Sequence, residues 1–182
     1  MVAKRALDFG TPRPTAKRRK ATNTVYRGKK LEMKDNTQIV SHIGATASNV
    51  LITSVANGAA ENERIGAKIK SWAIEGYIVT NQPVRLDLVI PSDVGGTPTP
   101  PNAFHSVIDT EDFTRLGTWY YNNNTPGTYE GMHFVHKLPY GVVTKFNGVL
   151  GTDGVKNPIY ARITNQTSAT VLGQFRLFYT DG

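Results

Sequence analysis

The sequence predicts an all-β fold, namely a single eight-stranded jelly-roll sandwich that follows a basic, disordered N-terminal arm. The first observation is a series of short runs, rich in β-branched and aromatic residues, in which apolar and polar residues alternate. The second is that Gly, Pro, Asn and Asp separate these runs, while helical periodicity is weak. The third is a change in charge near residue 30, which divides the chain into an arm, 1–30, and a body, 31–182.

The strand candidates begin at residue 37 and continue to the C-terminus. In the run 69–79, we expect Trp72, Ile74 and Ile78 to share one face, because successive side chains of a strand point to opposite faces. The run 85–90 alternates more cleanly and places its even-numbered leucines and isoleucine on one face. The other candidates are 37–43, 49–55, 118–122, 130–137, 142–147, 159–164 and 171–179.

The connections between these runs differ widely in length. The dipeptides Asn57-Gly58 and Asn147-Gly148 favour tight turns, whereas 91–102 and 122–128 are long irregular loops. The best helical candidate is a short turn at 109–116 with acidic residues suited to a helix N-terminus. Unequal loops favour a jelly roll, and the absence of a Cys-Trp-Cys pattern argues against an immunoglobulin-type sandwich.

Composition excludes several classes of site. The chain has no cysteine, so disulfides and thiol chemistry are excluded, and four scattered histidines do not make a Cys/His zinc site. No apolar run approaches the ~18 residues that would span a bilayer. The N-terminus has no apolar stretch typical of a secretory signal. We therefore expect synthesis inside the cell and no membrane partner.

Basic residues are concentrated in the arm. Residues 1–30 hold ten Lys and Arg and one acid, a net +9, whereas residues 31–182 hold eleven and thirteen, a net −2, which together give +7. With few large apolar groups, the arm is expected to be disordered when free and to bind nucleic-acid phosphates. The alternative is a solvated tail without a partner. The arm cations are Lys4, Arg5, Arg13, Lys17, Arg18, Arg19, Lys20, Arg27, Lys29 and Lys30.

The spacing of basic clusters in the arm predicts a second role. Lys4-Arg5 is followed by an eleven-residue spacer, 6–16, and then by Lys17-Arg18-Arg19-Lys20. Such clusters fit two acidic pockets of a nuclear import receptor, which makes this receptor a candidate partner. Any basic packaging arm contains similar clusters, so import is an additional role rather than the main one.

No arrangement of residues predicts catalysis, and we do not expect an enzyme. The histidines lie on different segments or, for His133 and His136, on opposite faces of one predicted strand. The only concentrated carboxylates are Asp109, Glu111 and Asp112, which have oxygen ligands suited to Ca²⁺. The alternative for these three residues is a helix N-terminus with favourable charges.

Three segments, namely 58–70, 178–182 and the basic clusters of the arm, resemble the coat proteins of small spherical viruses. The segment 58–70 is similar to the one before the second strand in coat proteins of satellite necrosis viruses and of circular Rep-encoding single-stranded DNA viruses. The matching positions are Arg64, Gly66, Lys68 and Ile69. The closing residues 178–182 resemble the end of the satellite virus coat. The basic clusters of the arm look more like geminivirus coats.

This resemblance implies a T=1 shell of roughly 60 identical subunits, in which the arm contacts the genome and the jelly roll forms the wall. Sixty arms at +9 would supply roughly 540 positive charges to offset phosphates. The import-like spacing favours single-stranded DNA over RNA, and localisation in the virion and, during assembly, in the host nucleus. In the satellite family calcium binds between subunits. For subunit contacts we expect exposed apolar residues such as Val89, Leu172 and Phe178.

Two other interpretations stay open. One is a coat protein of a satellite-type RNA virus. The other is a cellular nuclear β-sandwich protein that binds nucleic acid or acts as a chaperone, which would form a small oligomer rather than a shell. A jelly-roll lectin or enzyme is a third class, against which the cationic arm and the lack of a catalytic cluster both count.

Overall fold

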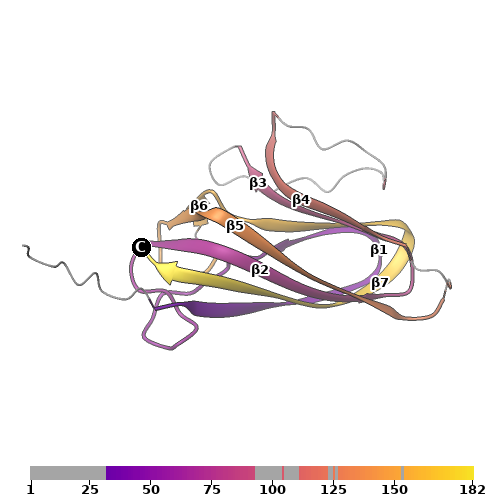
Figure 1. The fold of residues 1–182 in the computed structure, drawn as a ribbon, viewed down its shortest axis with the longest axis horizontal. Helices are drawn as coiled ribbons and strands as arrows, with labels where there is room; N and C mark the ends of the chain where they lie inside the picture. The colour runs from indigo at the N-terminus through magenta and orange to yellow at the C-terminus, as the bar shows by residue number, and fades with distance from the viewer. Residues whose placement is uncertain (1–31, 93–103, 105–110, 123–124, 126, 153) are drawn as a thin grey trace, which may run out of the picture. The chain divides into compact units, whose positions relative to one another are not determined.

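Figure 1 shows the computed structural model, which describes residues 32–92, 104, 111–122, 125, 127–152 and 154–182. These residues belong to one of two compact units into which the chain divides, Leu31–Gly182. All regular secondary structure in this part of the chain is β-strand. The strands are β1 (Lys34–Leu51), β2 (Lys68–Thr80), β3 (Val84–Pro91), β4 (Phe113–Tyr121), β5 (Glu130–Phe146), β6 (Gly154–Lys156) and β7 (Tyr160–Asp181).

Strand β7 organises the body because the described strands form one continuous seven-stranded sheet, and the two halves of β7 lie on either side of a bend in it. Its first half, 160–165, pairs with β3 on one edge and with residues 47–51 of β1 on the other. Its second half, 170–181, pairs with β2 and with residues 34–43 of β1. Irregular register between residues 43 and 47 of β1 accompanies the bend, which Figure 1 shows at the right-hand end of β7.

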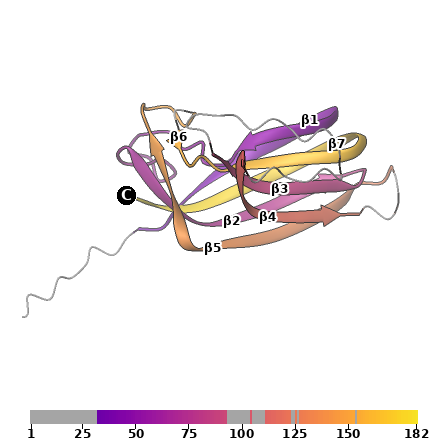
Figure 2. The same ribbon diagram turned by 90° about the horizontal axis from the view of Figure 1, so that it is seen from above.

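The bend folds this sheet into two facing antiparallel layers (Figures 1 and 2), which we call the first and the second sheet. The first contains the end of β1, the start of β7, β3 and β4, in that order. The second contains the start of β1, the end of β7, β2 and β5, with the short β6 beside β5. Since β1 and β7 count in both sheets, each sheet has four main segments, and the eight together form a jelly roll.

The hydrophobic core lies between the two sheets. Leu86 and Ile163 of the first sheet and Ile74 and Phe175 of the second have no exposed surface. Contact between the sheets is direct: the ring of Trp119 in β4 stacks on that of Phe134 in β5, with centroids 4.6 Å apart. Burial of this apolar area is the main favourable contribution to folding. In the predicted strand 171–179, Val171, Phe175, Leu177 and Tyr179 are all fully buried, and they alternate with more exposed residues from 174 onward.

The predicted strands are present but are joined into longer ones. The candidates 37–43 and 49–55 form the single strand β1, which ends at Leu51. Likewise 130–137 and 142–147 join in β5, and the last two candidates join in β7. Period-two alternation breaks where a strand bends or bulges, so the sequence pattern divides one strand into two.

The prediction that Trp72 shares a face with Ile74 and Ile78 is wrong. The pairing of β2 with both neighbours shifts between Ser71 and Ala73, which identifies a bulge at Trp72. Before the bulge Ile69 and Ser71 are buried, whereas after it Ile74 is buried. An extra residue reverses the faces of everything beyond it, so Trp72 does not share the core face with Ile74. Its indole nitrogen instead donates a hydrogen bond to Thr180 Oγ1 (3.1 Å).

Two further predictions are wrong. Val89 is fully buried rather than exposed, because every residue of β3 except Ile90 is buried and both faces of that strand are covered. Residues 113–116 of the proposed helical turn lie instead in β4. The backbone of residues 113–115 pairs with β3 from Pro91 to Val89, which a helix would not permit. Residues 109 and 110 of that turn and most of the loop 91–102 lie outside the described residues.

Gly76 is expected to be intolerant of any side chain. A Cβ added to this residue in β2 would lie 2.2 Å from the ring of Phe134, its cross-strand partner. We expect Gly76→Ala to lower the free energy of unfolding by about 1–3 kcal/mol, as overpacked cores do. Chemical denaturation should show a smaller loss when Phe134→Leu is the background. An equal loss in both backgrounds would contradict this explanation.

Candidate nucleic-acid interface

The ten arm cations predicted to bind nucleic acid all lie outside the described residues, as do the basic clusters predicted for import. Their roles therefore stay predictions. The described residues include the start of the body and all of its Lys and Arg side chains. Residues 31–182 contain eleven Lys and Arg, and each of these eleven lies in the described part.

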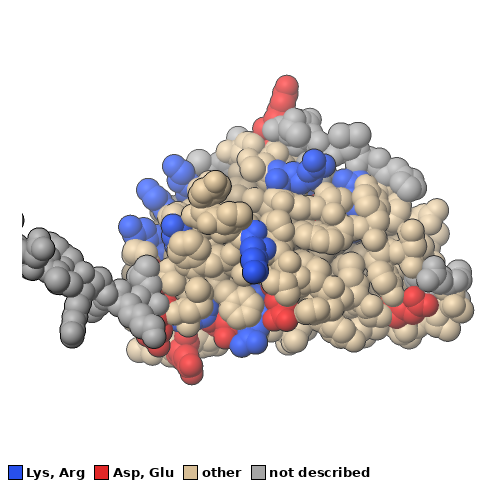
Figure 3. Space-filling view, viewed as in Figure 1, with Lys and Arg blue, Asp and Glu red and all other residues tan. Residues whose placement is uncertain are grey.

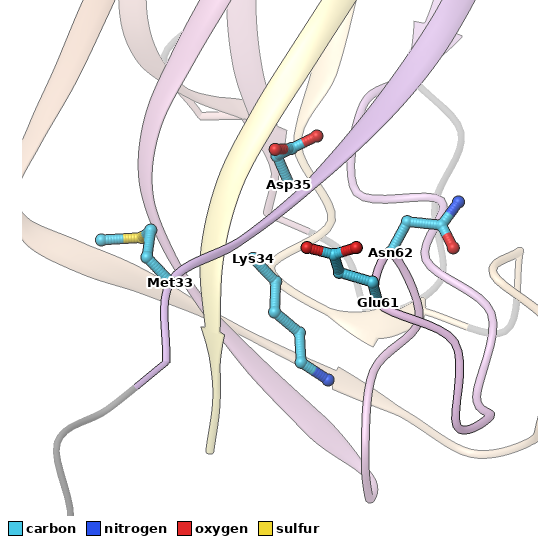
Figure 4. A pocket seen from close by; sticks show the side chains of 5 residues that line it. All are labelled: Met33, Lys34, Asp35, Glu61 and Asn62. Carbon is cyan, nitrogen blue, oxygen red and sulfur yellow. The ribbon is translucent and has the colours of Figure 1, made fainter.

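The start of β1 is fixed by Lys34. Its ammonium lies 2.9 Å from the carboxylate of Asp181 and donates a hydrogen bond to the carbonyl of Glu63 (2.9 Å). A hollow of about 330 Å³ lies beside it. In Figure 4 the Lys34 side chain extends away from the Glu61 carboxylate, which also lines this hollow. Because Asp35 and Glu61 also line this hollow, it is unsuited to a phosphate.

Arg64 has a structural role in the segment that resembles viral coat proteins. It is 1% exposed, and its guanidinium lies 4.0 Å over the ring of Phe146. The same group donates to the carbonyls of Val55 (3.0 Å), Gly66 and Gly148. Five donors in a fixed fork allow one arginine to hold several loop carbonyls at once. Arg64 thus joins the loop before β2 to the one after β5, and is not available to a ligand.

A second buried group of charges lies where β3 pairs with β7, on the face of that pair opposite to Leu86 and Leu88. Asp87 is fully buried, with Arg85 Nε 2.9 Å from its Oδ2 and the hydroxyl of Thr118 donating to Oδ1 (2.7 Å). Arg162, its cross-strand neighbour, is 4% exposed and lies 4.8 Å over the ring of Phe113. Burial lowers the pKa of Arg162, Asp87 opposes this effect, and Arg85 adds to it. Among the described residues, Asp87 therefore favours the charged form of Arg162 and pairs with Arg85.

The predicted calcium ligands are only partly described. Glu111 and Asp112 lie exposed in the turn before β4, and Asp109 is outside the described residues. Among the described residues, no group of three His, Cys, Asp or Glu side chains is placed to hold a metal ion. Calcium binding at these three residues stays a prediction.

The two histidines of β5 occupy opposite faces, as predicted. His133 Nε2 lies 3.0 Å from Glu75 Oε1 on the exposed face. His136 packs edge-on against Trp119, with ring centroids 5.4 Å apart, and burial lowers its pKa.

The part of the chain that is described contains no helix long and apolar enough to cross a membrane.

Sequence reasoning missed one feature of the surface. Lysines of β2, β5 and β6 lie side by side on one exposed region, although they are up to 88 positions apart in the chain (68 to 156). Figure 3 shows Lys and Arg side chains gathered at the end of the body where β5 and β6 lie. Alternation alone marks these lysines as outward-facing, but only the register brings them together.

Asp87 is expected to be essential for the buried charges around it. Asp87→Asn removes a buried negative charge that lies beside Arg85 and Arg162, and breaking a buried charge pair typically costs about 3–5 kcal/mol. Urea denaturation should therefore show a loss of this size. Thr118→Val, which removes one hydrogen bond and no charge, should cost about 1 kcal/mol. Equal losses would contradict a charge-compensation role.

His136 is expected to make stability depend on pH. Since its pKa is lowered in the folded protein, the unfolded chain binds the proton more readily once the pH falls below about 6.5, the ordinary value. Its contribution is thus complete above that value and declines as the pH falls. Thermal unfolding at pH 7.5 and 5.5 should show a smaller decline for His136→Gln than for the unchanged protein. His133→Gln is the control and should leave this part of the decline in place.

Comparisons with known proteins place the chain beside two solved structures. No protein-family model matches the sequence, and no curated protein matches it. The chain is similar to the Tobacco streak virus coat protein in a C2 crystal form, with a TM-score of 0.38, 13% identity and 82% and 88% of the two chains covered. For the Tobacco streak virus coat protein dimer, the values are 0.39, 11%, 82% and 86%. The jelly-roll assignment itself rests on the strand order and register described above.

Proposed function

We propose that the chain is a viral capsid protein, which assembles with copies of itself into a small shell and packages single-stranded nucleic acid. One observation carries the proposal: a net +9 arm is joined to a jelly-roll body whose net charge is −2. The arm supplies sequence-independent affinity for phosphates. The nearly neutral body allows copies to meet without strong repulsion. The proposed role is structural rather than catalytic.

Exposed apolar side chains on the body support self-association. Ile39 and Leu172 are 80% and 40% exposed and lie close together on the outer surface of β1 and β7, since Leu172 pairs with Ser41. Tyr140 and the pair Val149 and Leu150 are also exposed. Apolar surface of this kind is typical of protein contacts. Leu172 is one of the predicted contact residues, and Phe178 is half-buried.

Within this proposal, single-stranded DNA is favoured over RNA by the two basic clusters of the arm, whose spacing suits a nuclear import receptor. The protein would then enter the host nucleus during assembly and end in the virion as a homo-oligomer with T=1 symmetry. A satellite-type RNA virus coat differs only in genome and in the absence of import. A cellular nuclear β-sandwich protein would bind nucleic acid without forming a shell.

The test is assembly of the purified chain. We expect particles of uniform size by light scattering and electron microscopy, with nucleic acid inside that is protected from added nuclease. DNase or RNase digestion of the extracted nucleic acid then identifies its type. A chain that stays monomeric with and without nucleic acid contradicts the proposal, and a small oligomer supports the cellular alternative.

The arm is expected to be necessary for packaging but not for the fold. A chain without residues 1–30 should keep the β-sheet circular dichroism spectrum and the unfolding midpoint of the full chain. It should lose nucleic-acid content, measured as the absorbance ratio at two ultraviolet wavelengths, at near-physiological salt, where screening acts over roughly 8–10 Å. Undiminished packaging by the shortened chain would contradict this division of roles.

A further inference from the structure

Three lysines lie in register across three neighbouring strands. Lys68 of β2 pairs with Lys145 of β5, and Lys145 pairs in turn with Lys156 of β6. All three side chains are exposed. Adjacent strands are about 4.8 Å apart, so the row is roughly 10 Å long. We call Lys68, Lys145 and Lys156 the lysine row.

Such a row is unfavourable in the isolated body. Like charges directly opposite each other on neighbouring strands destabilise a sheet. No carboxylate among the described residues lies within ion-pair distance of these three ammonium groups. The nearest acid in register is Asp181, opposite Ile69, and its carboxylate already binds the Lys34 ammonium and the backbone nitrogen of Ile65. The repulsion is therefore uncompensated by any acid that the structure describes.

The row also contains a large share of the cations of the body that are not buried. Of the eleven Lys and Arg residues of the body, four are buried, namely Lys34, Arg64, Arg85 and Arg162. Of the other seven, three form the row and a fourth, Lys70, lies two residues from Lys68 on the same strand. The body as a whole carries a net negative charge, whereas Lys and Arg side chains gather in this region (Figure 3). A local field of this kind attracts anions.

Two aromatic side chains lie beside Lys70, further along β2 and β5 than the row itself. The ammonium of Lys70 lies 4.3 Å over the ring of Trp72. The stem of Lys70 also lies against Gly141, next to Tyr140, which is 90% exposed. Cations interleaved with exposed aromatic rings are typical of surfaces that bind single strands, because phosphates meet the cations and unpaired bases stack on the rings.

We propose that the lysine row is a second nucleic-acid site on the body, which binds consecutive phosphates of a single strand while Tyr140 stacks on a base. This rests on the proposed packaging function and adds a site to it. The row and the start of β1 lie at the same end of the second sheet, since Lys34 and Lys68 flank the last residues of β7. The arm is joined to the body there, so a strand held by the arm is kept at high local concentration near the row.

The test uses the full chain and a short labelled single-stranded DNA, with binding followed by fluorescence anisotropy over a series of salt concentrations. Each lost phosphate contact should reduce the slope of log affinity against log salt by about 0.7. We therefore expect Lys145→Gln to reduce the slope by this amount, and Lys68→Gln/Lys145→Gln by about twice as much. Arg115→Gln removes an exposed charge from β4, in the other sheet, and is the matched control. Equal slopes for the control and the row variants overturn the proposal.

Two further measurements test whether the row serves the fold and whether Tyr140 contacts a base. Lys145→Gln should melt no lower than the unchanged protein at low salt, because it relieves repulsion, and a lower melting temperature overturns a ligand-binding role. Tyr140→Leu should weaken binding roughly tenfold at an unchanged salt slope, and unchanged affinity overturns the base contact.

Particle formation distinguishes a failure of the nucleic-acid site from a failure of the capsid proposal. If the row instead contacts an acidic surface of a second copy, Lys145→Gln will reduce particle formation and leave DNA affinity unchanged, which overturns the nucleic-acid site. If the chain forms no particles but the row variants still lower the salt slope, the capsid proposal fails while the site on the body stands.

Discussion

The bend shared by β1 and β7 is the constraint on which the rest of the body depends. Each half of β7 pairs on both edges, so its backbone polar groups are satisfied in either sheet, and the bend brings the two sheets face to face. Only then are Leu86 and Ile163 buried against Ile74 and Phe175. The same bend positions Trp119 against Phe134 across the interior. A straight β7 would leave each sheet with one apolar face in water.

Two groups of cations in the body contrast in their surroundings. Arg64, Arg85 and Arg162 are buried, and each is held by carbonyls, a carboxylate or an aromatic face. Groups held in this way define one arrangement of loops and strands, since an unpaired buried charge is very costly. The lysine row is the opposite case, with exposed cations placed side by side and without an acid among the described residues. Charges of the first kind support the fold, and charges of the second kind are available to an anion.

This separation gives a coherent account of the proposed packaging. The arm would provide most of the attraction for nucleic acid, which is long-ranged and independent of sequence. The body would provide a surface of fixed geometry on which part of the strand adopts one path. Because a nearly neutral wall tolerates contact between copies, both contributions are compatible with a closed shell of identical subunits.

The sequence by itself determined the β class, the buried face of Leu86 and Leu88 in β3, the alternation in the second half of β7, and the separation of a cationic arm from the body. These follow from local composition and from alternation, which need no knowledge of the partner strand. Only the tertiary structure decided the face of Trp72, the burial of Val89 on the second face of β3, and the meeting of Lys68, Lys145 and Lys156. The physical reason is that bulges, bends and register depend on pairing between residues far apart in the chain, and a shift of one residue reverses every side chain beyond it.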